Sequence, residues 1–259
     1  MTARDTRRKQ MAEYIDQKKS VEMDELCNVF GVSMNTVRAD LAYLVSTGAV
    51  EKVYGGARSN LNHELHVFNQ RMGLNRDAKL RIAQEAAGRI NDKDIVYVDT
   101  GTTTLHLLDY LDPSKNVTIL TNNLQIISQA YNMPNINVIV LPGVMNRRTN
   151  AVTDSSTLEF LGRFHYAKAF MGASGISENG KLNVYTYIEY EIKKRAVHHG
   201  HEVYLLAASS KFGDVGFVSY GELSDLTELI TDKGCPDYIR KLCEEKNVKY
   251  TAVDPDADR

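Results

Sequence analysis

The chain has 259 residues, of which 43% are hydrophobic and 25% charged, and its formal net charge is -2. This composition is typical of a globular protein of one or two domains, and the near-neutral charge excludes a uniformly basic nucleic-acid-binding surface. No window approaches the roughly 18 consecutive apolar residues of a membrane span, and the first residues lack the apolar stretch of a secretory signal. Three cysteines, none in a CxxC pair, predict no disulfide framework. We therefore expect a cytoplasmic protein with no membrane partner.

The sequence pattern changes near residue 60. Residues 1–58 carry three short helical stretches and a turn, residues 59–75 form a polar segment with little periodicity, and residues 76–254 alternate apolar runs with amphipathic helices. These patterns predict a small helical domain, a linker, and the βαβ arrangement of a parallel sheet. The expected fold class is α/β, with a winged helix-turn-helix followed by a Rossmann-like domain.

The first domain shows the spacing of a helix-turn-helix. Apolar periodicity predicts helices over about 6–17, 24–30 and 35–48. Between the second and third helices, Gly31 is expected to adopt a positive φ and Ser33 to cap the next helix.

The segment after the third helix is typical of a hairpin turning at Gly55–Gly56. Small polar residues and Arg38 at the start of the third helix suit a recognition helix, whose first turns enter the major groove. The residues expected to contact DNA are Ser33, Asn35, Thr36, Arg38, Lys52, Tyr54 and Arg58. The same periodicity also fits a three-helix cap packed on the sheet, but the exposed polar helix start favours DNA binding.

Residues 30–57, FGVSMNTVRADLAYLVSTGAVEKVYGGA, resemble the N-terminal domain of the DeoR family of bacterial transcriptional regulators. The chain departs from the family pattern at Ala39, where members usually have a second arginine. The resemblance implies operator DNA as a partner, and the departure implies one phosphate or base contact fewer.

In the second domain, a predicted strand at 94–99 runs directly into Thr-Gly-Thr-Thr-Thr and an amphipathic helix. A strand, a glycine turn with hydroxyl residues and a helix N-terminus together favour a phosphate, through backbone N–H groups and the helix dipole. The turn is neither GxxxxGK[ST] nor GxGxxG, so neither ATP nor NAD is expected.

Polar residues also follow the later predicted strands. These strands cover 117–121, 137–141, 167–172, 202–207 and 228–231, which we take as the last of the series. Each ends in hydroxyl, amide, glycine or cationic residues. Because ligands of open α/β sheets bind outside the carboxyl ends of the strands, this repetition favours an anion-binding site over ordinary loops.

The segments KLRIAQEAA, VYVDTGTTT, VTILTNNL, SSKFG and LITD follow the order of the DeoR family's sensor domain, so the resemblance covers nearly the whole chain. It implies a core similar to ribose-5-phosphate isomerase and a phosphorylated sugar as effector. EKVYGGARS and EVYLLAASSKFG are especially similar to members that control inositol catabolism, which implies an inositol-derived phosphate. With Arg147 added from the third strand end, the expected effector contacts are Lys79, Asp99, Gly101, Thr102, Thr103, Thr104, Asn122, Arg147 and Lys211.

Three positions depart from the family's sensor pattern. Pro142 replaces a usual glycine, Asp154 stands near another glycine position, and Ala208 replaces the aspartate that precedes SSKFG. Together they imply an effector of different shape or lower acidity.

The alternative function is a sugar-phosphate isomerase or deaminase-like enzyme, which needs a carboxylate base and groups that stabilise an enediolate. Residues 170–177, FMGASGIS, contain no carboxylate where the isomerases carry acidic residues. Glu189 and Glu191 are typical of a solvated helix face. We therefore expect binding without turnover.

One of the three cations at 193–195 is expected to face the site, although the sequence does not select which. The histidines at 198, 199 and 201 lack recognised zinc spacing, so we expect no metal and no cofactor. Operator recognition through two half-sites predicts a homo-oligomer, either a dimer or a tetramer.

Overall fold

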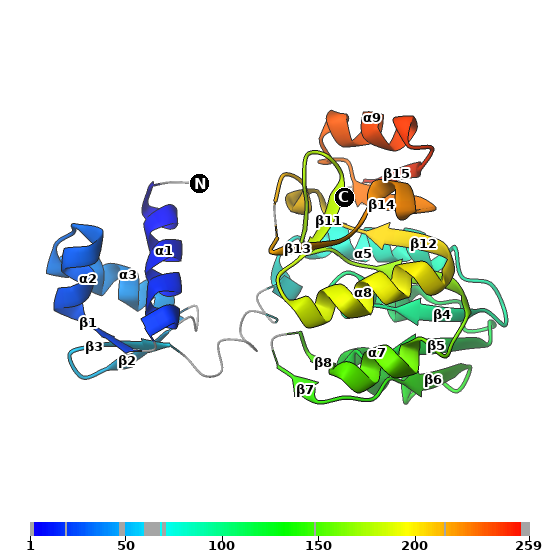
Figure 1. Ribbon diagram of the computed structural model, residues 1–259, viewed down its shortest axis with the longest axis horizontal. Coiled ribbons are helices and arrows are strands. Elements are labelled where there is room, and N and C mark those ends of the chain that lie inside the picture. Colours follow the sequence, from blue (N-terminus) through cyan, green and yellow to red (C-terminus); the bar gives the residue numbers. More distant parts are fainter. Residues whose placement is uncertain are drawn as a thin grey trace. The chain divides into compact units, whose positions relative to one another are not determined.

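A computed structural model describes residues 3–18, 20–46, 50–59, 68, 71–147, 149–214 and 216–254. The chain divides into two compact units, Met1–Arg71 and Met72–Arg259 (Figure 1). Most of the predicted linker, from residue 60 to residue 70 except Phe68, lies outside the described residues. Gly48, which was expected to end the third helix, also lies outside them.

The first unit is a winged helix-turn-helix, as predicted. Its helices are α1 (Ala3–Lys18), α2 (Met23–Phe30) and α3 (Met34–Ser46). Strands β1 (Ser20–Glu22), β2 (Val50–Val53) and β3 (Gly56–Ser59) form an antiparallel sheet in the order β1-β3-β2. The buried core consists of Met11, Ile15, Val21, Leu26, Val37, Leu41, Leu44, Val50 and Ala57.

Local signals in the turn between α2 and α3 are confirmed. Gly31 has a φ of 61°, and the Ser33 hydroxyl accepts a hydrogen bond from the Thr36 backbone N–H at 3.3 Å. The hairpin differs by one residue from the prediction. Val53 pairs with Gly56, so that the turn is Tyr54–Gly55 and Gly56 opens β3.

Strand β1 was not predicted, because a three-residue strand with one inward side chain carries no periodicity. It pairs with β3 so closely that a Cβ on Gly56 would lie 2.2 Å from the Val21 carbonyl oxygen. Glycine at position 56 therefore permits the third strand of this sheet.

A buried carboxylate organises the basic N-terminus. Asp40 on α3 is 1% exposed and accepts hydrogen bonds from Arg7 Nε at 2.7 Å and Arg8 Nε at 2.8 Å. Burial alone would raise the pKa of Asp40, but the bonds and charges of the two arginines outweigh it and lower the pKa. Two of the cations near the N-terminus are thus engaged inside the unit.

The second unit is built on a seven-stranded parallel sheet, which confirms the Rossmann-like prediction. Its strands, in spatial order, are β15 (Lys249–Val253), β14 (Glu228–Asp232), β12 (Gly200–Leu206), β9 (Tyr166–Met171), β4 (Ile95–Val98), β5 (Val117–Thr121) and β6 (Ile136–Val140). The prediction that the series ends at 228–231 was wrong. β15 is an edge strand of half-buried and exposed residues, so it lacks the apolar run that marked the others.

Helices cover both faces of this sheet (Figure 1). α5 (Arg76–Ala87), η1 (Thr104–Tyr110) and α6 (Leu124–Ala130) share one apolar core with Val96 and Val98. α7 (Ser155–Leu161), α8 (Tyr187–His199) and α9 (Asp237–Glu245) share the other core with Tyr97. Alternate residues of β4 thus point to opposite faces, as the strand geometry requires.

Several smaller elements, which the sequence did not predict, lie at the carboxyl edge of the seven-stranded sheet. Strands β10 (Gly175–Ile176), β11 (Lys181–Val184) and β13 (Val218–Glu222) form an antiparallel sheet, and β7 (Met145–Asn146) pairs with β8 (Ala151–Val152). Two short 3₁₀ helices, η2 (Ser209–Lys211) and η3 (Leu223–Asp225), complete the described elements.

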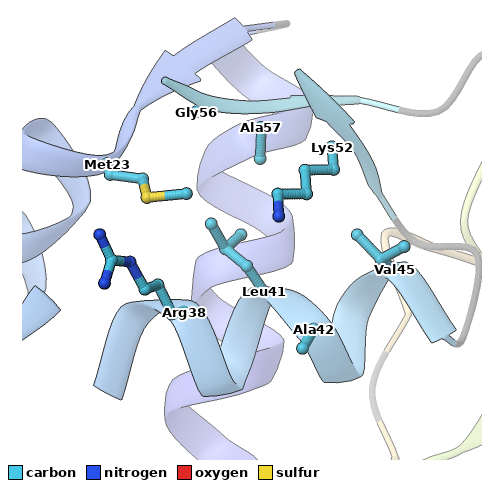
Figure 2. A pocket seen from close by; sticks show the side chains of 8 residues that line it. All are labelled: Met23, Arg38, Leu41, Ala42, Val45, Lys52, Gly56 and Ala57. Carbon is cyan, nitrogen blue, oxygen red and sulfur yellow. The ribbon is translucent and has the colours of Figure 1, made fainter. Parts of the chain in front are cut away.

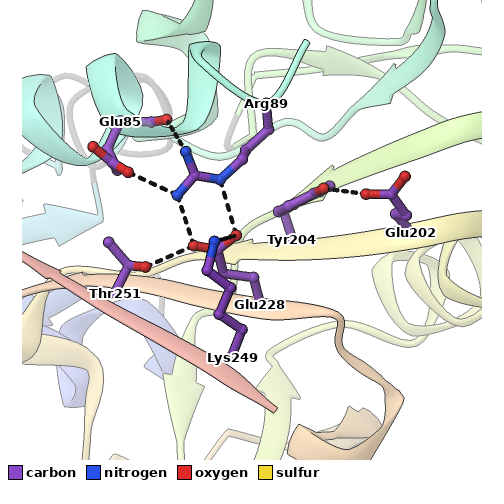
Figure 3. Close-up of polar contacts among 7 residues, drawn as sticks. All are labelled: Glu85, Arg89, Glu202, Tyr204, Glu228, Lys249 and Thr251. Carbon is purple, nitrogen blue, oxygen red and sulfur yellow. Dashed lines mark hydrogen bonds and ion pairs between the residues drawn. The ribbon is translucent and has the colours of Figure 1, made fainter. Parts of the chain in front are cut away.

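A polar network fastens the opposite, amino edge of the sheet (Figure 3). Glu228 begins β14 and is 2% exposed. It binds Arg89 in a two-pronged pair at 3.0 and 2.9 Å, and also Thr251 and Lys249. Burial would raise the pKa of Glu228, but these hydrogen bonds outweigh it and lower the pKa. The network joins the end of α5 to two strands, away from the carboxyl ends.

Candidate nucleic-acid face and effector site

The exposed start of α3 carries most of the predicted DNA contacts. The Ser33 and Thr36 hydroxyls lie 3.0 Å apart, and the Ser33 hydroxyl also caps the helix, so both help to form the turn. Asn35 and Arg38 are exposed beside them. This is the arrangement by which a recognition helix presents its first turns to base edges.

A groove of about 350 Å³ separates α3 from the β2–β3 hairpin (Figure 2). Arg38 comes from the helix and Lys52 from the hairpin, and the charged end of each lies beside the groove. The lining residues are Met23, Arg38, Leu41, Ala42, Val45, Lys52, Gly56 and Ala57. Both charged residues of this lining are cations, which suits a polyanion lying along the groove.

The hairpin itself presents two further predicted contacts. Tyr54 lies at the turn and is fully exposed. Arg58 is exposed and pairs with Glu51 at 2.6 Å, so its charge is partly compensated within the unit.

In the second unit, the parallel sheet has a topological switch point between β4 and β9. From β4 the chain continues to β5 and β6 on one side, then returns to β9 on the other. Asp99 follows β4, and its Oδ2 accepts the backbone N–H of Gly172, which follows β9, at 2.9 Å. A Cβ on Gly101 would lie 3.6 Å from the Gly172 Cα. The two strand ends thus approach closely, at the place where open α/β sheets bind ligands.

Lys193 from α8 completes this junction. Its ammonium group binds the Asp99 carboxylate and donates to the Gly172 carbonyl at 2.9 Å, while the Tyr220 hydroxyl donates to the same carbonyl at 3.0 Å. Both charged side chains are nearly buried.

Among the three cations at 193–195, Lys193 is therefore the one that reaches the switch point. Lys194 is exposed and donates to the Tyr190 hydroxyl at 3.0 Å. The helical spacing of Lys193 with Ala196 and Val197, both buried, was the signal that would have selected it.

The hydroxyl turn after β4 differs from the expectation in two ways. Thr104 is fully buried, and its hydroxyl donates to the carbonyls of Asp99 at 2.7 Å and Gly101 at 2.9 Å, so that it shapes the turn. The expected amphipathic α-helix is the short 3₁₀ helix η1. The chain leaves this helix at Leu111, whose backbone is extended with a ψ of 129°.

The predicted cations lie on different segments. Lys79 is buried on α5, and Asn75 just before that helix donates to Ser210 at 2.8 Å, beside Lys211. This contact joins the segments that carry the two lysines. Arg147 is exposed, immediately after β7.

Each of the three positions that depart from the family pattern lies at a local polar contact. Asp154 caps α7, and the Ser156 hydroxyl is the largest cause of its lowered pKa, so the charge serves the helix end. The Pro142 carbonyl accepts the Thr157 hydroxyl at 2.5 Å. Beside Ala208, the Ser209 N–H donates to the Asp232 carboxylate at 2.6 Å. A carboxylate from the next strand thus holds this loop.

One carboxylate that was considered for an enzymatic role is held by a local contact. Glu189 near the start of α8 accepts the Thr186 hydroxyl at 2.8 Å, which orients it toward the helix end. Within the described ranges, no group of three histidine, cysteine or acidic side chains is arranged to hold a metal ion. No described helix is both long and apolar enough to span a bilayer.

A winged helix-turn-helix joined to a sheet with a switch-point site defines a DNA-binding regulator with a small-molecule sensor domain. A model of the DeoR-like helix-turn-helix domain matches residues 7–63, and a model of the DeoR C terminal sensor domain matches residues 74–233. The chain belongs to the DeoR family, and it is a transcriptional regulator rather than an enzyme.

Similar proteins share nearly the full length. The chain is 41% identical to the HTH-type transcriptional regulator IolR of Bacillus subtilis, over 92% of this chain and 95% of that protein. It is 27% identical to the glycerol-3-phosphate regulon repressor of Escherichia coli, over 92% and 94%. Ribose 5-phosphate isomerase A of Methanocaldococcus jannaschii gives a TM-score of 0.39 at 18% identity, over 53% of this chain and 55% of that chain.

Proposed function

We propose that this regulator represses a sugar or polyol catabolic operon and leaves its operator when a phosphorylated sugar or inositol-derived effector binds the sensor domain. The junction of Asp99, Gly172 and Lys193 at the switch point is the observation that carries the proposal. It places a buried ion pair and a glycine-lined turn at the strand ends, where open α/β sheets bind small ligands. Relatives that are named as repressors, such as the glycerol-3-phosphate regulon repressor, support this direction of control.

The DNA contacts follow from the first unit. Asn35 and Arg38 read base edges from α3. Lys52 and Tyr54, on the hairpin beside α3, bind the sugar-phosphate backbone of the DNA. Ser33, Thr36 and Arg58 add hydrogen bonds to phosphates. The protein acts in the cytoplasm. It binds DNA as a homo-oligomer, because contacts to two operator half-sites compensate for the weak affinity of a single, modestly basic surface.

The effector contacts follow from the second unit. The phosphate lies against the backbone of Gly101 and the hydroxyls of Thr102 and Thr103, near Lys79 and Lys211. Asp99 and Thr104 shape this turn, Asn122 bounds it at β5, and Arg147 approaches from the β7–β8 hairpin.

Arg38→Ala and Lys211→Ala separate the two activities. Arg38→Ala should weaken operator binding at least roughly fivefold and relax its sequence preference, because one base-edge contact is lost, and it should leave effector binding intact. Lys211→Ala should retain operator binding and weaken effector binding. Gel shifts with the DNA upstream of the protein's own gene, across a salt series, measure the first effect; a thermal-shift screen of phosphorylated sugars and inositols measures the second.

Arg240→Ala is the matched control, because Arg240 is an exposed arginine on α9 with a weak pair to Glu244 at 3.5 Å. This variant should change neither operator binding nor effector binding. Operator binding that shows no salt dependence and no preference for the upstream DNA would refute the proposal.

A further inference from the structure

The two edge strands of the seven-stranded sheet differ in charge. β15, at one edge, begins with the exposed Lys249 and is followed by Asp254. β6, at the other edge, reads Ile-Asn-Val-Ile-Val and carries no charged residue (Figure 1). Natural proteins place lysines and other charges on exposed edge strands, because an uncharged edge readily pairs with another strand. β6 therefore lacks the protection that β15 has.

The absence of charge extends well beyond β6. Residues 116–146 contain no aspartate, glutamate, lysine, arginine or histidine, although 25% of the whole chain is Asp, Glu, Lys or Arg. This segment holds β5, α6 and β6, and four of its large apolar side chains are exposed: Tyr131, Val140, Val144 and Met145. Depletion of charge together with aromatic and methionine side chains is typical of the centre of a protein–protein interface. The β6 edge thus has the composition of a contact surface.

The hydrogen bonds between β5 and β6 show which backbone groups of β6 face outward. The Leu141 N–H donates to the Thr121 carbonyl at 2.9 Å, and the Asn135 carbonyl accepts the Val117 N–H at 3.1 Å. In a parallel pair, alternate residues bond to the neighbouring strand. Within 135–141, the odd-numbered residues therefore bond to β5, and the backbone groups of the even-numbered residues point away from the sheet.

Two of these outward residues have free backbone groups. The Ile136 N–H donates to the Met133 carbonyl at 3.0 Å, and Pro142, the next outward residue after β6, has no N–H. Between them, Val138 and Val140 form no outward backbone hydrogen bond within the part of the chain that the structure describes. Each offers one N–H and one carbonyl to a second strand.

These free groups determine how β6 pairs with a second copy of itself. A two-fold axis at Ile139 makes the two strands antiparallel and places Val138 of each copy opposite Val140 of the other. Each pair exchanges two N–H···O=C bonds, and all of these bonds use free groups. An axis one residue earlier would need the N–H of Ile136, and an axis one residue later would need an N–H from Pro142.

The exposed apolar side chains on either side of β6 fit the same arrangement. Tyr131 precedes the strand and is 90% exposed, and Val144 follows it and is 68% exposed. In an antiparallel pair, the start of one strand lies beside the end of the other. An apolar surface of one copy therefore meets an apolar surface of the other at both ends of the pair, as a two-fold interface requires.

We propose that β6 is a dimerisation edge, at which two copies of this chain join their sheets through antiparallel pairing of Val138 with Val140. This dimerisation edge rests on the homo-oligomer of the proposed function and assigns the surface that forms it. The backbone bonds set the register of the two strands, and the uncharged side chains around them are buried without an unpaired charge.

Val140→Pro and Val140→Lys test the dimerisation edge by sedimentation velocity on the full chain at micromolar concentration. The proline deletes an outward N–H, and proline is tolerated in an edge strand whose N–H faces solvent. The lysine adds a charge to a side chain that is 47% exposed. Each variant should reduce the particle mass to half and retain the circular dichroism spectrum of the folded chain. The lysine variant carries the test by itself if the proline variant does not fold.

Ala252→Lys is the matched control, because Ala252 is an exposed residue of β15, the other edge strand. The Lys249 N–H bonds to Thr227 and the Val253 carbonyl to Lys233, each at 3.1 Å, so residue 252 belongs to the outward set of its own strand. The same charge on this edge should leave the particle mass unchanged.

A cysteine at the two-fold axis gives an independent test of the register. Ile139→Cys places two cysteines opposite each other, with Cα atoms about 4.5 Å apart, which is within disulfide range. Asn137→Cys places them four residues out of register, about 14 Å apart at about 3.4 Å per residue, which is too far. After mild oxidation, non-reducing gel electrophoresis should show a covalent dimer for Ile139→Cys only. The three native cysteines are present in both variants.

A native particle mass in either folded Val140 variant, or equal cross-linking of the two cysteine variants, would overturn the dimerisation edge and leave the homo-oligomer to another surface. An unmodified chain that sediments as a monomer would overturn the dimerisation edge and the homo-oligomer together. DNA binding and effector binding are tested separately, by the Arg38 and Lys211 variants.

Discussion

At the scale of single residues, the structure shows which cation pairs with which carboxylate, whereas the sequence shows only a local excess of positive charge. Arg7 and Arg8 belong to the basic N-terminus, yet both bind the buried Asp40. Lys193 looks like its neighbours in the sequence, yet it alone among them reaches Asp99. In both cases a buried carboxylate selects its cation, since an unpaired buried charge is strongly unfavourable.

The Asp40 pair predicts an acid-sensitive winged unit. Because the pKa of Asp40 is lowered on folding from its ordinary value of 3.8, its contribution is complete above that pH and is lost as the pH falls through the lowered pKa. Thermal melting of the winged unit between pH 7 and pH 2.5 should show this loss.

Asp40→Asn provides the comparison. It should lower stability by about 3 kcal/mol at pH 7, because Arg7 and Arg8 lose their carboxylate, and it should flatten the acid limb. If the melting temperature of the variant falls as steeply at low pH as that of the unmodified protein, other carboxylates cause the acid sensitivity.

At the scale of elements, backbone approach decides which short strands form. β1 pairs with β3 only because Gly56 lacks a side chain, and β4 meets β9 where Gly101 and Gly172 adjoin. The hydrophobic pattern indicated the long strands of the sheet, but no pattern marks a three-residue strand or the switch-point contact.

Adjacent glycines of the hairpin give a matched test. Gly56→Ala should displace β1 and destabilise the winged unit by clearly more than 1 kcal/mol, because the new Cβ would lie 2.2 Å from the Val21 oxygen. Gly55→Ala has open space and only its positive φ of 77° to accommodate, so it should cost about 1 kcal/mol. Urea unfolding of both variants measures the difference. Equal costs would show that β1 does not constrain Gly56.

At the scale of the whole molecule, the proposed function requires coupling between the DNA face and the effector site. Linkage makes this coupling reciprocal for binding free energies. If effector weakens operator binding 5- to 150-fold, a coupling of about 1–3 kcal/mol, then operator DNA should weaken effector binding by the same factor.

Titration of effector into the protein, with and without saturating operator DNA, checks this reciprocity. Lys211→Ala should abolish both halves of the effect together. Full coupling in the Lys211→Ala variant would place Lys211 outside the effector site.

The sequence alone determined the two-part organisation, the winged helix-turn-helix, the parallel sheet and the family. These features depend on hydrophobic periodicity, turn residues and contiguous motifs, which are local signals that can be identified in the sequence itself. It also indicated the strand ends as the site, since Asp99, Gly101 and Asn122 directly follow apolar runs.

Only the tertiary structure decided which of these residues lie together at the strand ends and which contacts each of them makes. It selected Lys193, turned the Thr104 hydroxyl into a support for its own loop, and brought Asn122 against the β7–β8 hairpin. It also revealed β15, whose edge position needs no apolar run. These features depend on strand order and on close contacts between distant segments, and neither leaves a periodic trace in the sequence.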